Sequence, residues 1–466
     1  MKVLLINPPS LKGDIYMKEI GRCGTKTVAN EVWPQTGLAC LAAVLEKDSH
    51  DVKIIDAMAE NILFNEMLIG IKKFNPELIV MNTSTPTFTN DAAICDLIKK
   101  EIKTKIGFVG THVSVLPERS MKKSNADFLI IGEAEYTLKE LANNLPFDKI
   151  KGICYREDTE IKFNQSRPLI HDLDELPFPS RHLLPNDKYT MPFTSGKPFA
   201  TIIPSRGCPY KCIFCRSGSV WGKYARMRSP ENVFNEMKKV KEMGIDYITF
   251  MADTFTINKK WTLRLCELII ENKLKVSWLC NSRVDTIDED MLRSMKKAGC
   301  ILISYGIESG DQEILDLSEK GITIQQSKRA VELTKKIGIS MVGYYIIGLP
   351  GETWRTIKKT IDFSRELDTD YVEFHIATPF PGTKFYELAK SKGWLLSEDW
   401  EDFEEKDSSV LCTDKLSSED LIRAKKIAMR SFYFRPLKIL KYMKKIKNFS
   451  DFKSKLSAGA KLLVSF

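Results

Sequence analysis

Short apolar runs alternate with segments of helical periodicity in two series, and this alternation is the strongest constraint on the fold. The first series occupies about the first 150 residues and includes the runs KVLLIN, VKIIDA, ELIVMNTST, KIGFVGTH and DFLIIGEAE. Runs that are apolar throughout are typical of strands buried on both faces, and the helices between them supply the covering layers. The sequence therefore predicts an α/β protein that begins with a parallel sheet between two layers of helices.

Polar and glycine-containing stretches follow the strands of this first series: NPPS, NTSTPT, GTHVS and GEAE. The carboxyl ends of parallel strands meet at one edge of a sheet, where ligands of open α/β sheets bind. We therefore expect a Rossmann-like, ligand-binding domain over residues 1–150. The G-x-G-x-x-G motif of dinucleotide-binding proteins is missing from it.

A second series follows a stretch rich in Pro and Asp. Residues 151–193 contain HDLDELPFPSRHLLP, which indicates a linker. Six apolar runs then start at residues 199, 246, 276, 301, 341 and 371, with helix-length segments between them. Six consecutive βα units favour a curved, TIM-type parallel sheet with function in the loops after the strands. We expect a partial (β/α)6 barrel over residues 194–390 and a helical region over residues 391–466.

The positive charge of the chain is concentrated at its C-terminal end. Residues 421–466 contain thirteen Lys and Arg but a single acidic residue, Asp451, which gives them a charge of +12. The preceding 420 residues contain 57 basic and 60 acidic side chains, a net charge of −3. No apolar run approaches the ~18 residues that a membrane span needs, and the N-terminus lacks a secretory signal. The sequence predicts a cytoplasmic protein.

Three of the eleven cysteines cluster in the stretch SRGCPYKCIFCRSGS, directly after the first strand of the second series. Gly207 and Pro209 discourage a helix here, so Cys208, Cys212 and Cys215 are expected on a loop. Closely spaced thiolates are typical of iron-sulfur clusters, whereas a closed zinc site needs a fourth ligand that is not nearby. The spacing favours a [4Fe-4S] cluster with one open iron, and zinc or structural cysteines are the alternatives.

The C-x-x-x-C-x-x-C motif after the first strand of six βα units resembles the radical S-adenosylmethionine (SAM) superfamily. The resemblance implies that the open iron binds SAM and that reductive cleavage gives a deoxyadenosyl radical, which removes hydrogen from an unactivated carbon. Four residues match positions that contact SAM in that family: Phe214 beside the adenine, Asp253 at the ammonium, Arg283 at the carboxylate and Glu308 at the ribose.

The Rossmann-like layer before the barrel resembles the cobalamin-binding class of the superfamily, which includes radical methyltransferases and the anaerobic magnesium-protoporphyrin ester cyclase. Matching segments include INPP, TGLACLAAVLE, GTHVSVLPE, GEAEYTLKEL and TPFPGT. The resemblance implies cobalamin contacts at the strand ends, from Ser84, Thr85, Gly110, Thr111, His112, Gly132 and Glu133. The D-x-H-x-x-G motif of many cobalamin domains is missing, and His112 is more typical of a polar loop residue than of a cobalt ligand.

These features predict a cobalamin-dependent radical SAM enzyme that methylates an unactivated carbon of a small-molecule or lipid substrate. A cyclisation or rearrangement without methyl transfer is the alternative. A methylthiotransferase of transfer RNA is a more remote alternative, because Ser84 stands where those enzymes have a cysteine. A non-catalytic cofactor-binding module is a second remote alternative. An electron donor such as flavodoxin or ferredoxin is the expected partner, and nucleic acid is not favoured.

The segment FYFRPLKILKYMKKIK predicts an amphipathic helix in the basic tail. Its apolar side is expected to contain Ile439, Leu440, Tyr442, Met443 and Ile446, and its basic side Lys438, Lys441, Lys444 and Lys445. Such a helix can lie on an anionic membrane surface. A helix packed on the barrel with a solvated basic face is the competing interpretation.

Overall fold

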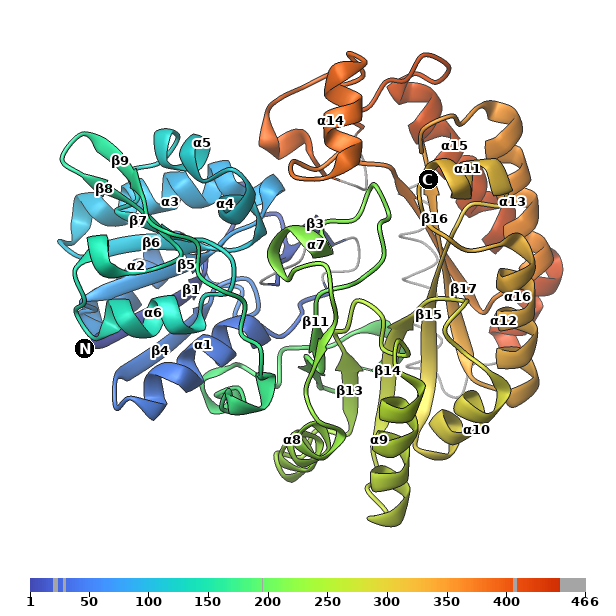
Figure 1. Cartoon of the computed structure of the whole chain (residues 1–466), viewed down its shortest axis with the longest axis horizontal. Helices are drawn as coiled ribbons and strands as arrows, with labels where there is room; N and C mark the ends of the chain where they lie inside the picture. The colour runs from blue at the N-terminus through green and yellow to red at the C-terminus, as the bar shows by residue number, and fades with distance from the viewer. Residues whose placement is uncertain (20–23, 28–30, 195, 405–408, 445–466) are drawn as a thin grey trace.

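The computed structural model describes residues 1–466 except 20–23, 28–30, 195, 405–408 and 445–466. Two parallel-stranded sheets dominate the fold, one in each half of the described chain (Figure 1). Two further antiparallel ribbons have two residues per strand: β2 (Tyr16–Met17) with β3 (Thr25–Lys26), and β11 (Ser205–Arg206) with β12 (Arg226–Met227).

The first sheet has seven strands in the order β4-β1-β5-β6-β7-β8-β9. Its parallel strands are β1 (Lys2–Asn7), β4 (Asp51–Asp56), β5 (Leu78–Asn82), β6 (Lys105–Val109) and β7 (Phe128–Ile130). Its helices are α1 (Thr36–Lys47), α2 (Phe64–Phe74), α3 (Phe88–Glu101), α4 (Thr111–Val115), α5 (Pro117–Lys122) and α6 (Glu135–Ala142). After β1 the chain forms its neighbour β4 on one side, and after β5 it forms β6 and β7 on the other side. The strand order therefore reverses between β1 and β5, and the crevice at the ends of these two strands is the expected ligand position.

An antiparallel hairpin extends this sheet beyond residue 150. Strand β8 (Ile153–Glu157) pairs with β7, and β9 (Glu160–Phe163) pairs with β8. The sheet thus includes the beginning of the segment that the sequence pattern suggested as a linker. Charged residues interrupt both strands, and β9 lies at an edge of the sheet where one face stays in solvent, so neither strand forms an apolar run.

The second sheet has six parallel strands in chain order, as the six apolar runs predicted. They are β10 (Phe199–Ile202), β13 (Tyr247–Phe250), β14 (Ser277–Ser282), β15 (Cys300–Glu308), β16 (Ser340–Ile347) and β17 (Tyr371–Ile376). The helices that follow them are α8 (Pro230–Glu242), α9 (Lys259–Glu271), α10 (Glu289–Lys297), α11 (Gln312–Leu317), α12 (Ile324–Ile337) and α13 (Trp354–Leu367). Helix α8 begins where Ser229 accepts a hydrogen bond from the Asn232 amide and Pro230 occupies the first turn.

The two halves share a continuous apolar core. One cluster of buried side chains includes Leu5 and Leu38 of the first sheet and its helix α1, together with Phe199 and Leu279 of the second sheet. Trp33 adds an edge-to-face contact with Phe199, at a ring-centroid distance of 5.5 Å. Burial of apolar area across this boundary stabilises the contact between the two sheets.

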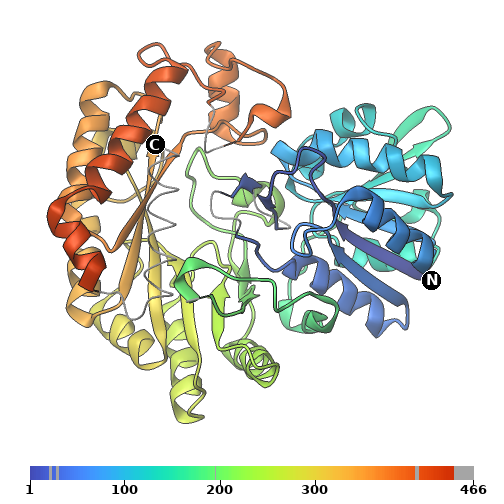
Figure 2. The same cartoon turned by 180° about the vertical axis from the view of Figure 1, so that it is seen from behind.

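The chain after the second sheet is helical, with α14 (Lys384–Ser391), α15 (Ser418–Tyr433) and α16 (Pro436–Lys444). Figure 2 shows α15 and α16, in red, along the outer side of the second sheet. The Tyr433 hydroxyl donates to the Val372 carbonyl of β17 over 2.8 Å, which fixes α15 there. No helix in the described part of the chain is long and apolar enough to cross a membrane.

Helix α16 buries Lys438 against the protein, which differs from the predicted arrangement, whereas Lys441 stays 61% exposed. Lys438 and Lys441 both form ion pairs with Asp368, and the Tyr442 hydroxyl donates to the Asp370 carbonyl. Leu437 and Leu440 are instead 75% and 52% exposed. The acidic group at the end of α13 attracts the basic side of the helix, a contact that the helix sequence alone does not reveal. The side chains of residues 443–446 lie outside the described residues.

Candidate cofactor site

The cysteine loop, residues 207–225, is closed at its base by the β11–β12 ribbon, in which Arg206 pairs with Arg226. Gly207 has a φ of +86°, and a Cβ atom there would lie 2.3 Å from the Tyr224 carbonyl oxygen. Only glycine tolerates both the left-handed conformation and this close approach. The turn into Cys208 therefore depends on Gly207.

Two segments of the second half hold the middle of the loop. The Ile213 amide donates to the Ser318 carbonyl over 3.1 Å, in the turn after α11. The Ile213 carbonyl accepts from the Phe385 amide over 3.0 Å, at the beginning of α14. Because Ile213 lies between Cys212 and Cys215, these two bonds fix the part of the loop where the cysteines are closest in sequence. Phe214 is half-buried and packs against the core of the second sheet.

The three thiols of the loop have raised pKa values. Burial is the main cause for Cys208 and Cys212, which are half-buried. For Cys215 the surrounding protein raises the pKa to about 12, although the residue keeps exposed surface. The thiols are thus protonated at neutral pH, and binding of iron would displace the three protons.

No three His, Cys, Asp or Glu side chains in the described part of the chain converge tightly enough to bind a single metal ion. A [4Fe-4S] cluster does not require its ligands to converge on one point, because each thiolate binds a different iron atom. Three soft sulfur ligands on one loop match that donor set.

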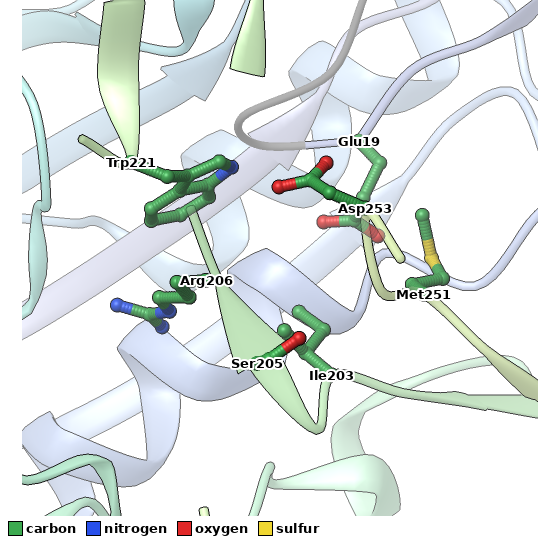
Figure 3. Close-up of a pocket in the computed structure, with 7 residues that line it drawn as sticks. All are labelled: Glu19, Ile203, Ser205, Arg206, Trp221, Met251 and Asp253. Atoms are coloured by element: carbon green, nitrogen blue, oxygen red, sulfur yellow. The ribbon is translucent and has the colours of Figure 1, made fainter. Parts of the chain in front are cut away.

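Asp253 lies after β13 and faces the cysteine loop. It accepts a hydrogen bond from the Ser217 hydroxyl over 2.5 Å, two residues after Cys215. It also lines a small pocket, shown in Figure 3, whose lining consists of Glu19, Ile203, Ser205, Arg206, Trp221, Met251 and Asp253. Glu19 belongs to the first half of the chain, so this pocket lies between the two halves.

Arg283, after β14, is buried against the same loop. Its guanidinium lies 3.5 Å from the ring centroid of Tyr210, between Cys208 and Cys212 in the sequence. It makes two hydrogen bonds of 2.9 Å to the carboxylate of Asp285 and a third to the Lys320 carbonyl. The structure therefore brings Arg283 to the cysteine loop with much of its donor capacity already used.

Glu308 ends β15 in an unusual backbone conformation. Its φ is +64°, and the pairing of β15 with β16 shifts register between Gly306 and Glu308. Its carboxylate forms a buried ion pair with Lys320, at a distance of 2.5 Å. Sequence reasoning missed Lys320, because nothing in the segment SEKGIT marks it as different from a surface lysine. Backbone strain of this kind often accompanies functional sites.

The predicted cobalamin contacts lie at the strand ends of the first sheet, and most of them are buried. Ser84, Thr85, Thr111 and His112 are almost fully buried. The segment that contains β2 and β3 covers Ser84. Gly24 of this segment lies so close that a Cβ atom on it would be 2.1 Å from the Ser84 hydroxyl. Gly110 has a φ of +136° and packs against the Thr83 carbonyl, whereas the space around Gly132, with a φ of +78°, is open among the described residues.

His112 lies between two aromatic rings. Its ring centroid is 4.6 Å from that of Phe88 and 4.3 Å from that of Trp400, and its Nδ1 lies 3.3 Å from the Thr85 hydroxyl. Its Nε2 has no hydrogen-bond partner among the described residues. Burial, with a contribution from Arg216, holds the pKa of His112 well below 6.5. The imidazole is therefore neutral at physiological pH.

Two asparagines flank the crevice of the first sheet. Asn7 ends β1 and Asn82 ends β5, and the Oδ1 atom of each is buried without a hydrogen-bond partner in the described structure. Unsatisfied buried acceptors are rare in folded proteins and often mark a site for a ligand or ion. The two acceptors could accept hydrogen bonds from the amide groups of a ligand such as cobalamin.

Arg216 joins the two candidate sites. It follows Cys215 directly, yet its Nη1 lies 3.2 Å from the Thr85 hydroxyl at the end of β5. Its guanidinium also lies 4.7 Å from the ring centroid of Phe380, after β17. The cysteine loop and the strand ends of the first sheet are thus in direct contact.

Glu133 has a different environment from the other predicted cobalamin contacts. Both of its carboxylate oxygens are bound in the structure, Oε1 to Arg206 and Oε2 to Arg226 and the Ile170 amide. Little acceptor capacity remains for a ligand.

Comparisons with known proteins agree with this arrangement. The model of the B12 binding domain matches residues 23–142, and that of the Radical SAM superfamily matches residues 202–364. An uncharacterized methyltransferase from Pyrococcus horikoshii is 38% identical over 95% of this chain and 94% of its own. The anaerobic magnesium-protoporphyrin IX monomethyl ester cyclase from Rubrivivax gelatinosus is 28% identical over 83% of this chain and 70% of its own. The cobalamin-dependent SAM radical enzyme OxsB, solved with aqua-cobalamin and SAM, has a TM-score of 0.75 and 17% identity, covering 100% of this chain and 71% of its own.

Proposed function

The chain belongs to the cobalamin-binding class of the radical SAM superfamily, as its motifs predicted, and we propose that it methylates an unactivated carbon of its substrate. The family uses a [4Fe-4S] cluster, SAM and cobalamin. A relative named as a methyltransferase, similar over almost its whole length, supports this choice of reaction.

The residues of the second half would hold the cluster and SAM. Cys208, Cys212 and Cys215 supply the three thiolates. Asp253 and Arg283, which both contact the cysteine loop, have the charges to bind the ammonium and carboxylate of an amino acid. Phe214 and Glu308 are the proposed contacts of the adenine and the ribose.

The strand ends of the first sheet would hold cobalamin, with Ser84, Thr85, Gly110, Thr111, His112 and Gly132 as the proposed contacts and the free acceptors of Asn7 and Asn82 beside them. When bound, these cofactors supply a radical that removes hydrogen from the substrate and a methyl group that replaces it. The chain itself binds, orients and shields the reacting groups.

The contact between Arg216 and Thr85 is the observation that supports this proposal most directly. Methyl transfer needs the cobalt and the SAM site at one shared cavity. Arg216 belongs to the cysteine loop and Thr85 to the strand end of the cobalamin domain, so the two proposed sites adjoin each other. Two independent cofactor modules would not require such a contact.

Anaerobic purification after reconstitution with iron, sulfide and cobalamin tests the proposal. The absorption spectrum should show cluster and corrin bands together, and reduction in the presence of SAM should release 5′-deoxyadenosine. Absence of the cluster bands and of 5′-deoxyadenosine would contradict the enzyme assignment and leave a cofactor-binding module.

A cyclase or rearrangement reaction is the second candidate, because one of the relatives is a cyclase. SAM labelled on its methyl group separates the two reactions. Only methylation transfers the label to the product, whereas a cyclase leaves it on methionine. A low-potential one-electron donor such as flavodoxin or ferredoxin is the proposed partner in either case.

We also propose that the C-terminal helix contacts an anionic membrane surface from the cytoplasmic side. The exposed side chains of Phe434, Leu437 and Leu440 form an apolar side on a segment of high positive charge. Insertion of this side among lipid headgroups would bury apolar area and bring the remaining basic residues near anionic lipids. A lipid or another hydrophobic substrate is then an attractive candidate.

A further inference from the structure

We propose that Glu133 is a positioning residue for the cysteine loop, so that the shape of this loop depends on contact with the cobalamin domain. Glu133 follows β7 of the first sheet, while its two arginine partners form the β11–β12 ribbon at the base of the loop. The inference rests on the proposed function only in taking Cys208 as a cluster ligand.

The ribbon is a weak element by itself. Each strand has two residues, and Arg206 lies directly opposite Arg226. Like charges at opposite positions of an antiparallel pair repel each other, and both guanidinium groups are almost fully buried, which strengthens the repulsion. A ribbon this short does not offset that cost with its own backbone bonds.

Carboxylates of the first half remove the repulsion. Glu133 Oε1 lies 3.0 Å from Arg206 Nη1 and Oε2 lies 2.9 Å from Arg226 Nη1, so a single carboxylate bridges the two opposed cations. Glu135 forms a second ion pair with Arg206. The four side chains are almost fully buried, so their interactions are little screened by solvent or salt.

A chain of contacts continues from this carboxylate to the first cysteine. Arg226 Nη2 donates to the Trp221 carbonyl over 2.8 Å. The Arg206 guanidinium lies 4.6 Å from the Trp221 ring centroid, and Figure 3 shows the side chains of Arg206 and Trp221. The next carbonyl, that of Gly222, accepts from the Cys208 amide over 3.4 Å. Glu133 therefore holds both ends of the segment that places Cys208.

Glu133 thus has a role other than the cobalamin contact that the family resemblance implies. Loss of its charge would leave two buried, opposed arginines with only Glu135 as an acidic partner. The ribbon would open, and Cys208 would lose its fixed position relative to the other two cysteines. Loss of Glu135 alone would have a smaller effect, because Glu133 would still bridge the pair.

Hydrogen–deuterium exchange on the full-length, cofactor-free chain tests the proposal. Glu133→Gln should accelerate exchange of amides in residues 205–227 about tenfold or more, and Glu135→Gln should do so less. Asp56→Asn is the control, since Asp56 is a fully buried carboxylate of the first sheet whose partners, Asn7, Ala59 and Tyr189, lie outside the ribbon. If Glu133→Gln does not fold, Arg226→Lys tests the same contact. The lysine keeps the positive charge but lacks the guanidinium group, which binds the Glu133 carboxylate and the Trp221 carbonyl at the same time.

A second measurement uses the loaded protein. With cluster and cob(II)alamin both paramagnetic, pulsed electron paramagnetic resonance gives the distribution of distances between them, and Glu133→Gln should broaden it. Unchanged exchange in residues 205–227 and an unchanged distance distribution would overturn the proposal. So would an equal effect of Asp56→Asn on exchange in residues 205–227. The exchange experiment needs no cofactor, so it tests this inference even if the proposed function is wrong. A failure of the proposed function would appear only in the experiments that use the loaded protein.

Discussion

Lys320 Nζ lies 2.5 Å from Glu308 Oε1, and each side chain is only 8% exposed. The Lys320 carbonyl also accepts from Arg283, so one residue contacts two of the predicted SAM-binding side chains. Because Lys320 belongs to the turn that bonds to Ile213, the SAM contacts and the cysteine loop share one support.

Lys320→Met should destabilise the protein by about 3–5 kcal/mol, because it leaves a buried carboxylate unpaired. Lys320→Met/Glu308→Gln should recover much of this loss, and SAM affinity should fall in both variants. Chemical denaturation and equilibrium SAM binding measure these effects. Lys384→Met is the control, since Lys384 forms an exposed ion pair with Glu319 that contributes about 0–1 kcal/mol. Equal effects of the two single substitutions would contradict the assignment.

Replacement of Cys208, Cys212 or Cys215 by Ala should abolish cluster binding and reductive SAM cleavage. Each thiolate is expected to bind its own iron, so the remaining two do not complete the site. Iron and sulfide content and release of 5′-deoxyadenosine are the measurements. Cys412→Ala, at a half-buried cysteine outside the loop, should keep both properties. Retention of SAM cleavage in any of the three loop variants would refute the assignment of that cysteine.

The contribution of Glu352 to stability should fall as pH rises from about 4.5 to 8. Burial raises the pKa of Glu352 to about 8, and its Oε2 accepts from the amides of Gly348 and Leu349 after β16. Within this window the unfolded chain releases the proton and the folded chain keeps it, so the folded state loses stability relative to the unfolded one.

Glu352→Gln mimics the protonated carboxyl and removes this dependence. The unfolding free energy of the variant relative to wild type should rise by about 2–4 kcal/mol between pH 5 and pH 8. Asp56, whose pKa burial raises to about 6, titrates in both proteins and cancels in the comparison. A pH-independent difference would show that Glu352 titrates normally.

The strands and the cysteine loop could be predicted from sequence because both have local signals. Buried parallel strands form apolar runs, so β13 to β17 coincide with the predicted runs to within about two residues. The β11–β12 ribbon has two residues per strand, too few for any periodicity. The bond between Glu133 and Arg226 joins residues 93 apart in sequence, and such pairings depend on the assembled fold.

His112 shows the limit of prediction from a motif. The segment GTHVS places it at a strand end, as predicted, but its neighbour Trp400 comes from a distant 3-10 helix, Trp400–Asp402. The ion pairs of Lys438 and Lys441 have the same cause, since their partner Asp368 belongs to another element. Local sequence gives the position of a side chain along an element, whereas its partners depend on packing.

His112→Leu should leave the electron paramagnetic resonance spectrum of bound cob(II)alamin unchanged, because the imidazole lies between Phe88 and Trp400. Loss of a nitrogen coupling that the wild type shows would instead identify His112 as a cobalt ligand. The variant should also resist acid better. The pKa of His112 is depressed in the folded state, so wild-type stability falls below pH 6.5, by up to about 1.4 kcal/mol per pH unit, and the variant lacks this loss.

Leu437→Asp/Leu440→Asp should weaken binding to vesicles that contain anionic lipid by tenfold or more, since each leucine contributes about 1.5–3 kcal/mol when it is buried. Co-sedimentation with liposomes measures this, and added salt should weaken binding further. Ile69→Asp is the control, because Ile69 is 68% exposed on α2 of the first domain. The two leucines are 75% and 52% exposed, so the double substitution should leave the fold intact. Binding that survives it, or that survives deletion of residues 431–466, would show that the tail does not contact the membrane.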